Sequence, residues 1–263
     1  MSGYAAVVSA RFRTLLQYRA AALAGLGTQI IFGLIRVMIL GAFYAVSPGP
    51  HPMTYAQVVT YVWLGQAMIR LLPWNADTEV TAMIRSGGVA YELLRPLDLY
   101  TLWYARTVAM RTAPTLLRAL PMFIIAGLFL GLQAPPSFAS AAAWVASVAG
   151  ALALSCALTV LMTISALWTI SGDGVFYLIA VAGMVFGGMV IPLPLFPDWV
   201  QPVLNVLPFR GLGDVPCRIY SGNIPPSDAV LCVVQQFAWS AGLIALGRVL
   251  LARGLRRLVV QGG

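Results

Sequence analysis

The chain has 263 residues, of which 60% are hydrophobic and 9% are charged, and its mean hydropathy is +0.87. This composition excludes an ordinary soluble core and predicts an all-α polytopic membrane protein with one transmembrane domain over 1–263. The formal net charge is +8, and every basic residue is an arginine because the chain has no lysine. The arginines flank apolar runs and do not form a basic patch with interleaved aromatic residues. We therefore expect no nucleic-acid partner.

The N-terminal segment, 1–19, combines arginines with apolar side chains at near-helical spacing, which predicts an amphipathic interfacial helix. The apolar run after it, 20–46, exceeds the about 7–15 residues of a signal-peptide core, so we expect a retained first span over roughly 21–46. Arg36 falls near the middle of that span. A charge at this depth costs about 2.5 kcal/mol or more, so Arg36 either has a structural pairing role or lines a translocation path.

A short loop without arginine precedes the second span, expected at about 54–72, and a polar loop follows it over 73–105. This loop holds half of the acids in the chain and is predicted to be cytoplasmic. Within it, Gly87-Gly88 permits a tight turn and Pro96 disfavours helix at Arg95. The residues between these two points, Val89 to Leu94, are predicted to form about two turns of helix at the membrane surface. We expect this helix to bind a soluble partner.

The third span begins in a basic stretch, where Arg111 and Arg118 lie seven residues apart and share a helix face. We expect this stretch to start as an interfacial helix and to enter the bilayer late, with Pro114 and Pro121 able to bend it. The fourth span is expected at about 139–170.

A tight turn at 171–174 leads to the fifth span, expected at about 175–192. Prolines then interrupt the apolar segment 193–226, which predicts short re-entrant helices on the outer side. The sixth span is expected at about 228–250. The pair Gly183 and Gly187 allows close helix packing, either within the bundle or between subunits.

Arginine placement predicts the orientation, because short cytoplasmic loops are enriched in lysine and arginine. With the N-terminus inside, only Arg210 and Arg218 fall in outer segments. We therefore expect both termini in the cytoplasm of a bacterial cell, with six spans crossing its inner membrane.

The chain lacks the residues that several kinds of site require. Without lysine the chain has no nucleotide-binding P-loop. His51 is the only histidine, and the three cysteines have no metal-type spacing, so neither a metal site nor a disulfide framework is expected. An enzymatic role, such as a membrane-embedded transferase, lacks candidate catalytic residues.

The string from Gly88 to Asp98, together with the Ile191-Pro192 to Trp199 and Leu207-Pro208-Phe209 segments, resembles the membrane subunit of type-2 ABC exporters. More closely, it resembles the six-span ABC-2 branch of viologen and multidrug-type exporter permeases. The resemblance covers essentially the whole chain.

The resemblance implies a permease that binds no cofactor itself and relies on ATP and magnesium held by two separate ATPase subunits. It also implies a second permease subunit, identical or paralogous, surrounding membrane lipids, and an amphipathic or hydrophobic small molecule as cargo. Met184, Phe186 and Met189 join Arg36 as candidate pathway residues, and Gly172 and Asp173 form a second, smaller cytoplasmic contact. The coupling helix that docks on the ATPase would use Val89, Tyr91, Glu92, Leu93, Leu94, Arg95, Pro96 and Asp98, with Glu92, Arg95 and Asp98 as polar anchors.

One alternative function stays open from the sequence: an ATP-independent secondary transporter or channel. Such a protein would favour intramembrane carboxylates or broken helices in matched halves. Asp173 instead falls at an expected turn, and the two halves show no evident repeat.

Overall fold

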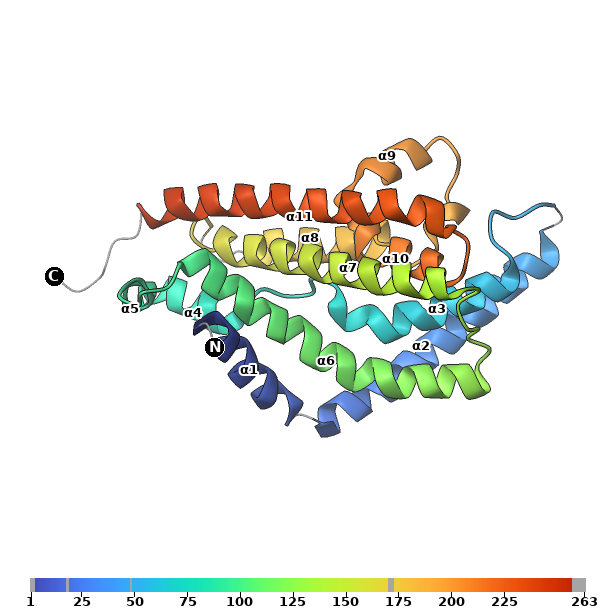
Figure 1. Cartoon of the computed structure of the whole chain (residues 1–263), viewed down its shortest axis with the longest axis horizontal. Coiled ribbons are helices and arrows are strands. Elements are labelled where there is room, and N and C mark those ends of the chain that lie inside the picture. Colours follow the sequence, from blue (N-terminus) through green and yellow to red (C-terminus); the bar gives the residue numbers. More distant parts are fainter. Residues whose placement is uncertain (1–2, 18, 48, 170–172, 257–263) are drawn as a thin grey trace.

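The computed structural model describes residues 3–17, 19–47, 49–169 and 173–256, and all regular elements in these ranges are helical. The long helices lie side by side along the longest axis of the molecule (Figure 1). The α-helices are α1 (Gly3–Leu16), α2 (Arg19–Val46), α3 (Tyr55–Met68), α4 (Thr78–Arg85), α5 (Val89–Leu93), α6 (Leu99–Phe129), α7 (Phe138–Ser165), α8 (Asp173–Phe186), α9 (Gln201–Val206), α10 (Asp214–Tyr220) and α11 (Pro226–Leu255). The 3-10 helices are η1 (Ile69–Leu71), η2 (Leu193–Leu195) and η3 (Pro208–Leu212).

Four helices of the described chain are long and apolar enough to cross a membrane: α2 from Ala24 onward, α6, α7 and α11. Each exceeds the about 20 residues that a bilayer core requires. The second and fifth expected spans correspond to α3 and α8, of 14 residues each, which fall short of that length. The all-helical membrane fold is thus confirmed with four candidate spans, while the count of six stays a prediction.

The core of the bundle lies along α7 and α3. Gln236 of α11 ties the elements around α7 together, because its side-chain amide donates to the backbone oxygens of Ser147 and Gly211 while its carbonyl oxygen accepts from the Ser147 hydroxyl. In α3 every residue from Val58 to Met68 is buried. This short helix is therefore enclosed by protein.

Side-chain caps set several helix starts. Thr54 and Gln57 form a capping box at α3. The carboxylate of Asp98 accepts from the backbone N–H of Thr101, so α6 begins at Leu99, earlier than the end of the expected loop at 105. Pro114 and Pro121 both lie inside α6, which continues through them to Phe129.

Arg111 does not lie on an outward-facing basic surface of α6, although the depth at which α6 enters the bilayer stays a prediction. Its side chain is 1% exposed, and its guanidinium donates to the hydroxyl of Thr159 on α7 and to the backbone oxygen of Asn75. The helix face that carries Arg111 therefore points into the bundle, where neutral acceptors of α7 and of the chain before α4 take its hydrogen bonds.

The segment 193–226 forms the short helices η2, α9, η3 and α10, as its prolines predict. Asp214, 1% exposed, anchors it: the carboxylate accepts from the Tyr61 hydroxyl at 2.9 Å and the Leu193 backbone N–H at 3.3 Å, and pairs with Arg218 at 3.4 Å. The segment is thereby fixed to α3. Its position relative to a membrane stays a prediction.

The glycine pair of the fifth span packs within the bundle. A Cβ on Gly187 would lie 2.2 Å from the backbone oxygen of Gly183 and 3.3 Å from that of Phe209, whereas one on Gly183 would make an ordinary 3.4 Å contact with Leu212. Gly187 lets the chain at the end of α8 approach η3 closely, which favours the intrachain alternative for this motif.

The two ends of the bundle differ in content. One end carries α4, α5, the start of α1 and the end of α11, and the opposite end carries the α2–α3 connection and the starts of α7 and α11 (Figure 1). We call the first of these the α4–α5 end.

Candidate functional site

The short helix expected in the polar loop is present as α5, Val89–Leu93, and α4 precedes it. Gly87 has φ +74, a left-handed conformation that glycine adopts without strain, and it joins the two helices. The carboxylate of Asp77 accepts from the backbone N–H groups of Glu79 and Val80 and so caps α4. The loop is thus a pair of ordered helices.

Two predicted coupling residues point into the protein. Val89 is fully buried in a cluster with Val80 and Tyr100, and Glu92 is 6% exposed. Oε2 of Glu92 accepts a 2.9 Å hydrogen bond from the indole N–H of Trp103 on α6. The structure therefore places Glu92 as an internal anchor of α5 and not, as expected, as an outward polar contact.

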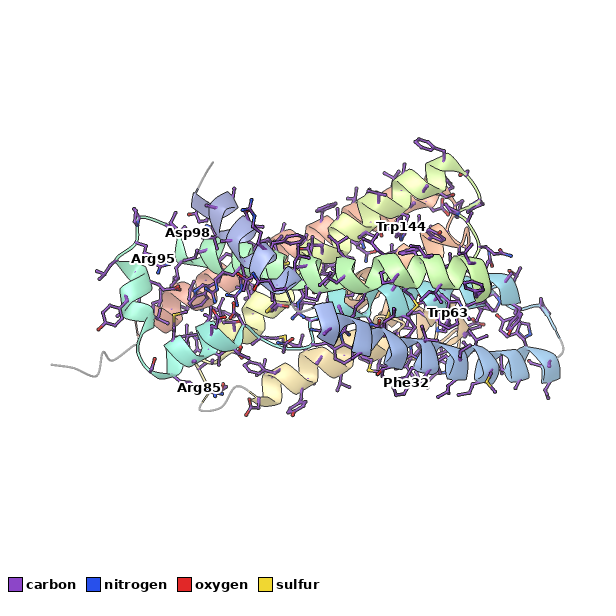
Figure 2. The ribbon with its side chains drawn as sticks, turned by 90° about the horizontal axis from the view of Figure 1, so that it is seen from below. Phe32, Trp63, Arg85, Arg95, Asp98 and Trp144 are labelled. Atoms are coloured by element: carbon purple, nitrogen blue, oxygen red, sulfur yellow. The ribbon has the colours of Figure 1, made fainter. Side chains whose placement is uncertain are left out.

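The opposite face of α5 and the residues after it are open. Tyr91 is 78% exposed and Leu94 is 82% exposed, and Leu93, Arg95 and Pro96 are exposed as well. Figure 2 shows Arg95 at the α4–α5 end of the molecule. This surface, which we call the α5 knob (Tyr91, Leu93, Leu94, Arg95 and Pro96), combines large apolar side chains with one cation.

Asp98 serves the fold first. Besides capping α6, it lies 3.5 Å from Arg248 on α11, and its backbone N–H donates to the Tyr4 hydroxyl on α1 at 2.8 Å. The hydrogen bonds from Thr101 hold the pKa of the Asp98 carboxyl below its usual range. Asp98 therefore links three helices at the base of the α5 knob.

An ion-pair network ties α4 to α1 and α6. Arg11 and Arg106 each contact the carboxylates of Asp77 and Glu79, with the shortest distances being 2.8 Å and 2.6 Å to Glu79. Asp77 is buried, and its backbone N–H donates to Thr163 of α7. The side-chain hydrogen bonds from Arg11 and Arg106 lower the pKa of Glu79 to about 2. These contacts therefore couple the position of α4 to α1, α6 and α7.

The second predicted contact is only partly described. Gly172 lies outside the described residues. Asp173 begins α8, and its carboxylate lies 3.9 Å from the guanidinium of Arg85 at the end of α4. Both residues line an open groove of about 550 Å³ between α4 and α8, at the α4–α5 end.

The candidate pathway residues separate into two groups. Arg36 and Met184 line one groove of about 380 Å³, and Arg36 and Met189 line a smaller cavity beside Tyr61. Phe186 lines neither and instead faces the ring of Phe209. Arg36, Met184 and Met189 are thus gathered by the fold, while Phe186 packs against η3.

Several contacts were not anticipated from the sequence. The Arg11–Arg106 network, the burial of Arg111 and the Tyr61–Asp214 hydrogen bond all join residues far apart in the chain. Only Asp77 and Asp98 have a local sequence pattern that indicates their structural role, because each stands directly before a helix as a capping residue.

A helical bundle with spans of membrane length and an ordered, partly apolar knob at one end defines a polytopic membrane protein. The model of the ABC-2 family transporter proteins matches residues 52–262, and the chain belongs to that family. No curated protein and no solved structure matches the chain.

Family membership has direct consequences for energy supply. ABC-2 membrane permeases lack an ATPase domain, so this chain is a transporter membrane protein that needs ATPase partner subunits. Among the described residues no group of three or more His, Cys, Asp or Glu side chains could hold a metal ion.

Proposed function

We propose that the chain is the permease subunit of an ABC exporter, in which two permease subunits and two ATPase subunits move an amphipathic small molecule outward across a bacterial inner membrane. Both termini would lie in the cytoplasm, because α1 begins and α11 ends at the α4–α5 end, which would face the cytoplasm. The observation that carries the proposal is the division of α5: Val89 and Glu92 are buried against the bundle while Tyr91 and Leu94 are bare.

The α5 knob suits a docking element in its chemistry. Aromatic and apolar side chains with an arginine beside them are the residue types that dominate binding energy at protein interfaces. The ordered loop behind the knob is held to α1, α6 and α7 by Arg11, Arg106 and the Asp77–Thr163 hydrogen bond. A rigid connection of this kind is what transmission of a domain movement into the spans requires.

Asp173 and Arg85 provide a second candidate contact at the same end of the bundle. Their 3.9 Å ion pair is exposed, so it contributes little to stability and is open to exchange for partner charges. We propose that the ATPase subunit covers this pair together with the α5 knob.

The test is co-purification in mild detergent of the tagged chain with its ATPase subunit, for wild type and for the double variant Tyr91→Ala/Leu94→Ala. We expect the variant to lose the ATPase subunit while remaining monodisperse. Trp199→Ala is the matched control, since Trp199 is 79% exposed in the connection between η2 and α9, outside the α5 knob, and it should retain the ATPase. Equal recovery with the double variant would contradict docking at α5.

A flux assay separates the proposal from the alternative. In vesicles that contain the chain and its ATPase, cargo movement should require hydrolysable ATP. Gradient-driven flux by the purified chain alone would favour an ATP-independent transporter or channel and would contradict the proposed exporter.

A further inference from the structure

A groove of about 380 Å³ opens between α2, η1, α6 and α8, and arginines from three of these elements line it: Arg36, Arg70 and Arg118. Arg36 lies well inside both ends of α2, and Arg118 lies well inside both ends of α6. Charges at such a depth are unfavourable unless they meet an opposite charge or water. We call this site the arginine groove.

No aspartate or glutamate of the described chain lines the arginine groove. All eight acids of the chain lie in the described residues, and none of them lines it. Within the described chain Arg36 and Arg70 donate to no protein acceptor, and the Nε of Arg70 is buried without a partner. Among the described residues, the positive charges of Arg36 and Arg70 therefore have no protein partner.

Two buried amides independently indicate a missing ligand. Gln29 is 5% exposed and Gln66 is 1% exposed, and both line the groove. In the described structure both amide atoms of Gln29 and the side-chain nitrogen of Gln66 lack hydrogen-bond partners. Buried polar groups rarely stay unpaired, because desolvation without a partner is unfavourable. The oxygens of an anion would satisfy the two amide N–H groups and the guanidinium groups together.

An apolar groove continues from the charged one. It has a volume of about 540 Å³ between α2 and the chain after α8, with Ile39, Phe43 and Ile191 among its lining residues. Phe32 and Arg36 line both grooves, and Figure 2 shows Phe32 on the outer side of α2. One molecule could thus place a polar group at Arg36 and an apolar chain along α2.

We propose that the arginine groove binds the anionic group of an amphiphile, a phosphate, sulfonate or carboxylate, and that the apolar groove holds its hydrocarbon part. The inference deepens the proposed function and rests on it in one respect, namely that this amphiphile is the cargo. Selection would follow charge: a neutral or cationic molecule of the same length leaves Arg36, Arg70 and the amide nitrogens of Gln29 and Gln66 without partners.

The test measures equilibrium binding of radiolabelled octyl phosphate to the full-length chain in phosphatidylcholine nanodiscs. We expect saturable binding that octanol and octyltrimethylammonium do not displace. Arg36→Gln and Arg70→Gln should each raise the Kd about tenfold or more, because each removes a charge-assisted contact. Arg36→Lys and Arg70→Lys, which keep the charge, should recover part of the affinity.

Matched controls exist for both kinds of variant. Arg253→Gln changes an exposed arginine near the end of α11 and should bind octyl phosphate as wild type does. A Cβ on Gly25 would lie 2.4 Å from Cζ of Arg118, whereas one on Gly27 meets nothing within 4 Å. Gly25→Ala should therefore displace the Arg118 guanidinium and weaken binding several-fold, while Gly27→Ala should not, although both favour helix equally.

Two sources of the anion are distinguished by lipid composition. If phosphatidic acid added to the nanodiscs displaces octyl phosphate at low molar fraction, the groove is a site for acidic lipid headgroups. If it does not, but octyl phosphate still binds, the groove selects a smaller free amphiphile. Both results support an anionic amphiphile. If inorganic phosphate displaces octyl phosphate at similar concentrations, the apolar groove contributes nothing to the affinity. That result would overturn the proposal that this groove holds the hydrocarbon part.

Binding of octyl phosphate that is equal in wild type, Arg36→Gln and Arg70→Gln, or that octanol displaces, would overturn the anion site. These measurements need no ATPase subunit. Failure of the anion site is therefore distinct from failure of the exporter proposal, which is decided by co-purification and ATP-dependent flux.

Discussion

The indole N–H of Trp103 donates a 2.9 Å hydrogen bond to Oε2 of Glu92, and both side chains are buried where α5 meets α6. This bond, together with the buried side chain of Val89, holds one face of α5 against the bundle. It also gives a direct test of whether the placement of Glu92 is structural.

Glu92→Ala should lower the stability of the chain by about 1–3 kcal/mol, because the Trp103 indole N–H then remains buried without an acceptor. Glu92→Gln keeps an acceptor oxygen and should lose less. Thermal unfolding in detergent measures both. A double-mutant cycle with Trp103→Phe should show strong coupling between the two positions, and additive effects would contradict a direct contact.

The two roles of Asp77 can be separated by substitution. Asp77→Asn keeps an oxygen to cap α4 but loses the charge that pairs with Arg11 and Arg106, and Asp77→Ala loses both. We expect both variants to be less stable than wild type and Asp77→Ala to be the worse by about 1 kcal/mol, the usual contribution of an N-cap. Equal stability of the two variants in a thermal unfolding assay would show that the cap contributes nothing.

The Glu79 network predicts a specific pH dependence. The folded pKa of Glu79 is about 2, below its unfolded value of 4.5, so its contribution to stability is complete above about pH 4.5 and is lost as the pH falls toward 2. Unfolding of wild type and Glu79→Gln should therefore differ at pH 6 and converge near pH 2. Because the Glu79 side chain is 64% exposed, the difference should be small and should shrink further in high salt. A difference that persists unchanged at pH 2 would contradict the assignment.

Glycine is required at position 188 because of the backbone conformation there and because of a neighbouring side chain. Its φ is +77, and a Cβ there would lie 2.1 Å from the Tyr61 hydroxyl, which donates to Asp214. Gly188→Ala should therefore destabilise the chain by more than about 1 kcal/mol and loosen the segment 193–226. Gly242→Ala, inside α11 where a Cβ meets nothing within 4 Å, is the control and should be at least as stable as wild type, because alanine favours helix over glycine. Limited proteolysis at 193–226 gives a second readout.

The sequence alone determined the class of the protein and the position of its polar loop. Apolar runs and turn residues are local signals, so the chain predicted α2, α6, α7 and α11 as membrane-length helices, a short helix after Gly88, and a proline-broken segment before α11. The absence of lysine also excluded a P-loop from the chain. The ABC-2 resemblance agrees with the family match over 52–262.

Only the tertiary structure decided which way side chains point and which distant residues meet. On a helix as short as α5, the order of apolar and polar residues does not reveal which face is buried. Glu92 was therefore expected to face outward, whereas its hydrogen bond with Trp103 holds it inside. Arg111 likewise needed Thr159 of another helix to explain its burial. The arginine groove joins α2, η1 and α6, because burial, pairing and charge compensation are properties of packed helices and not of any single one.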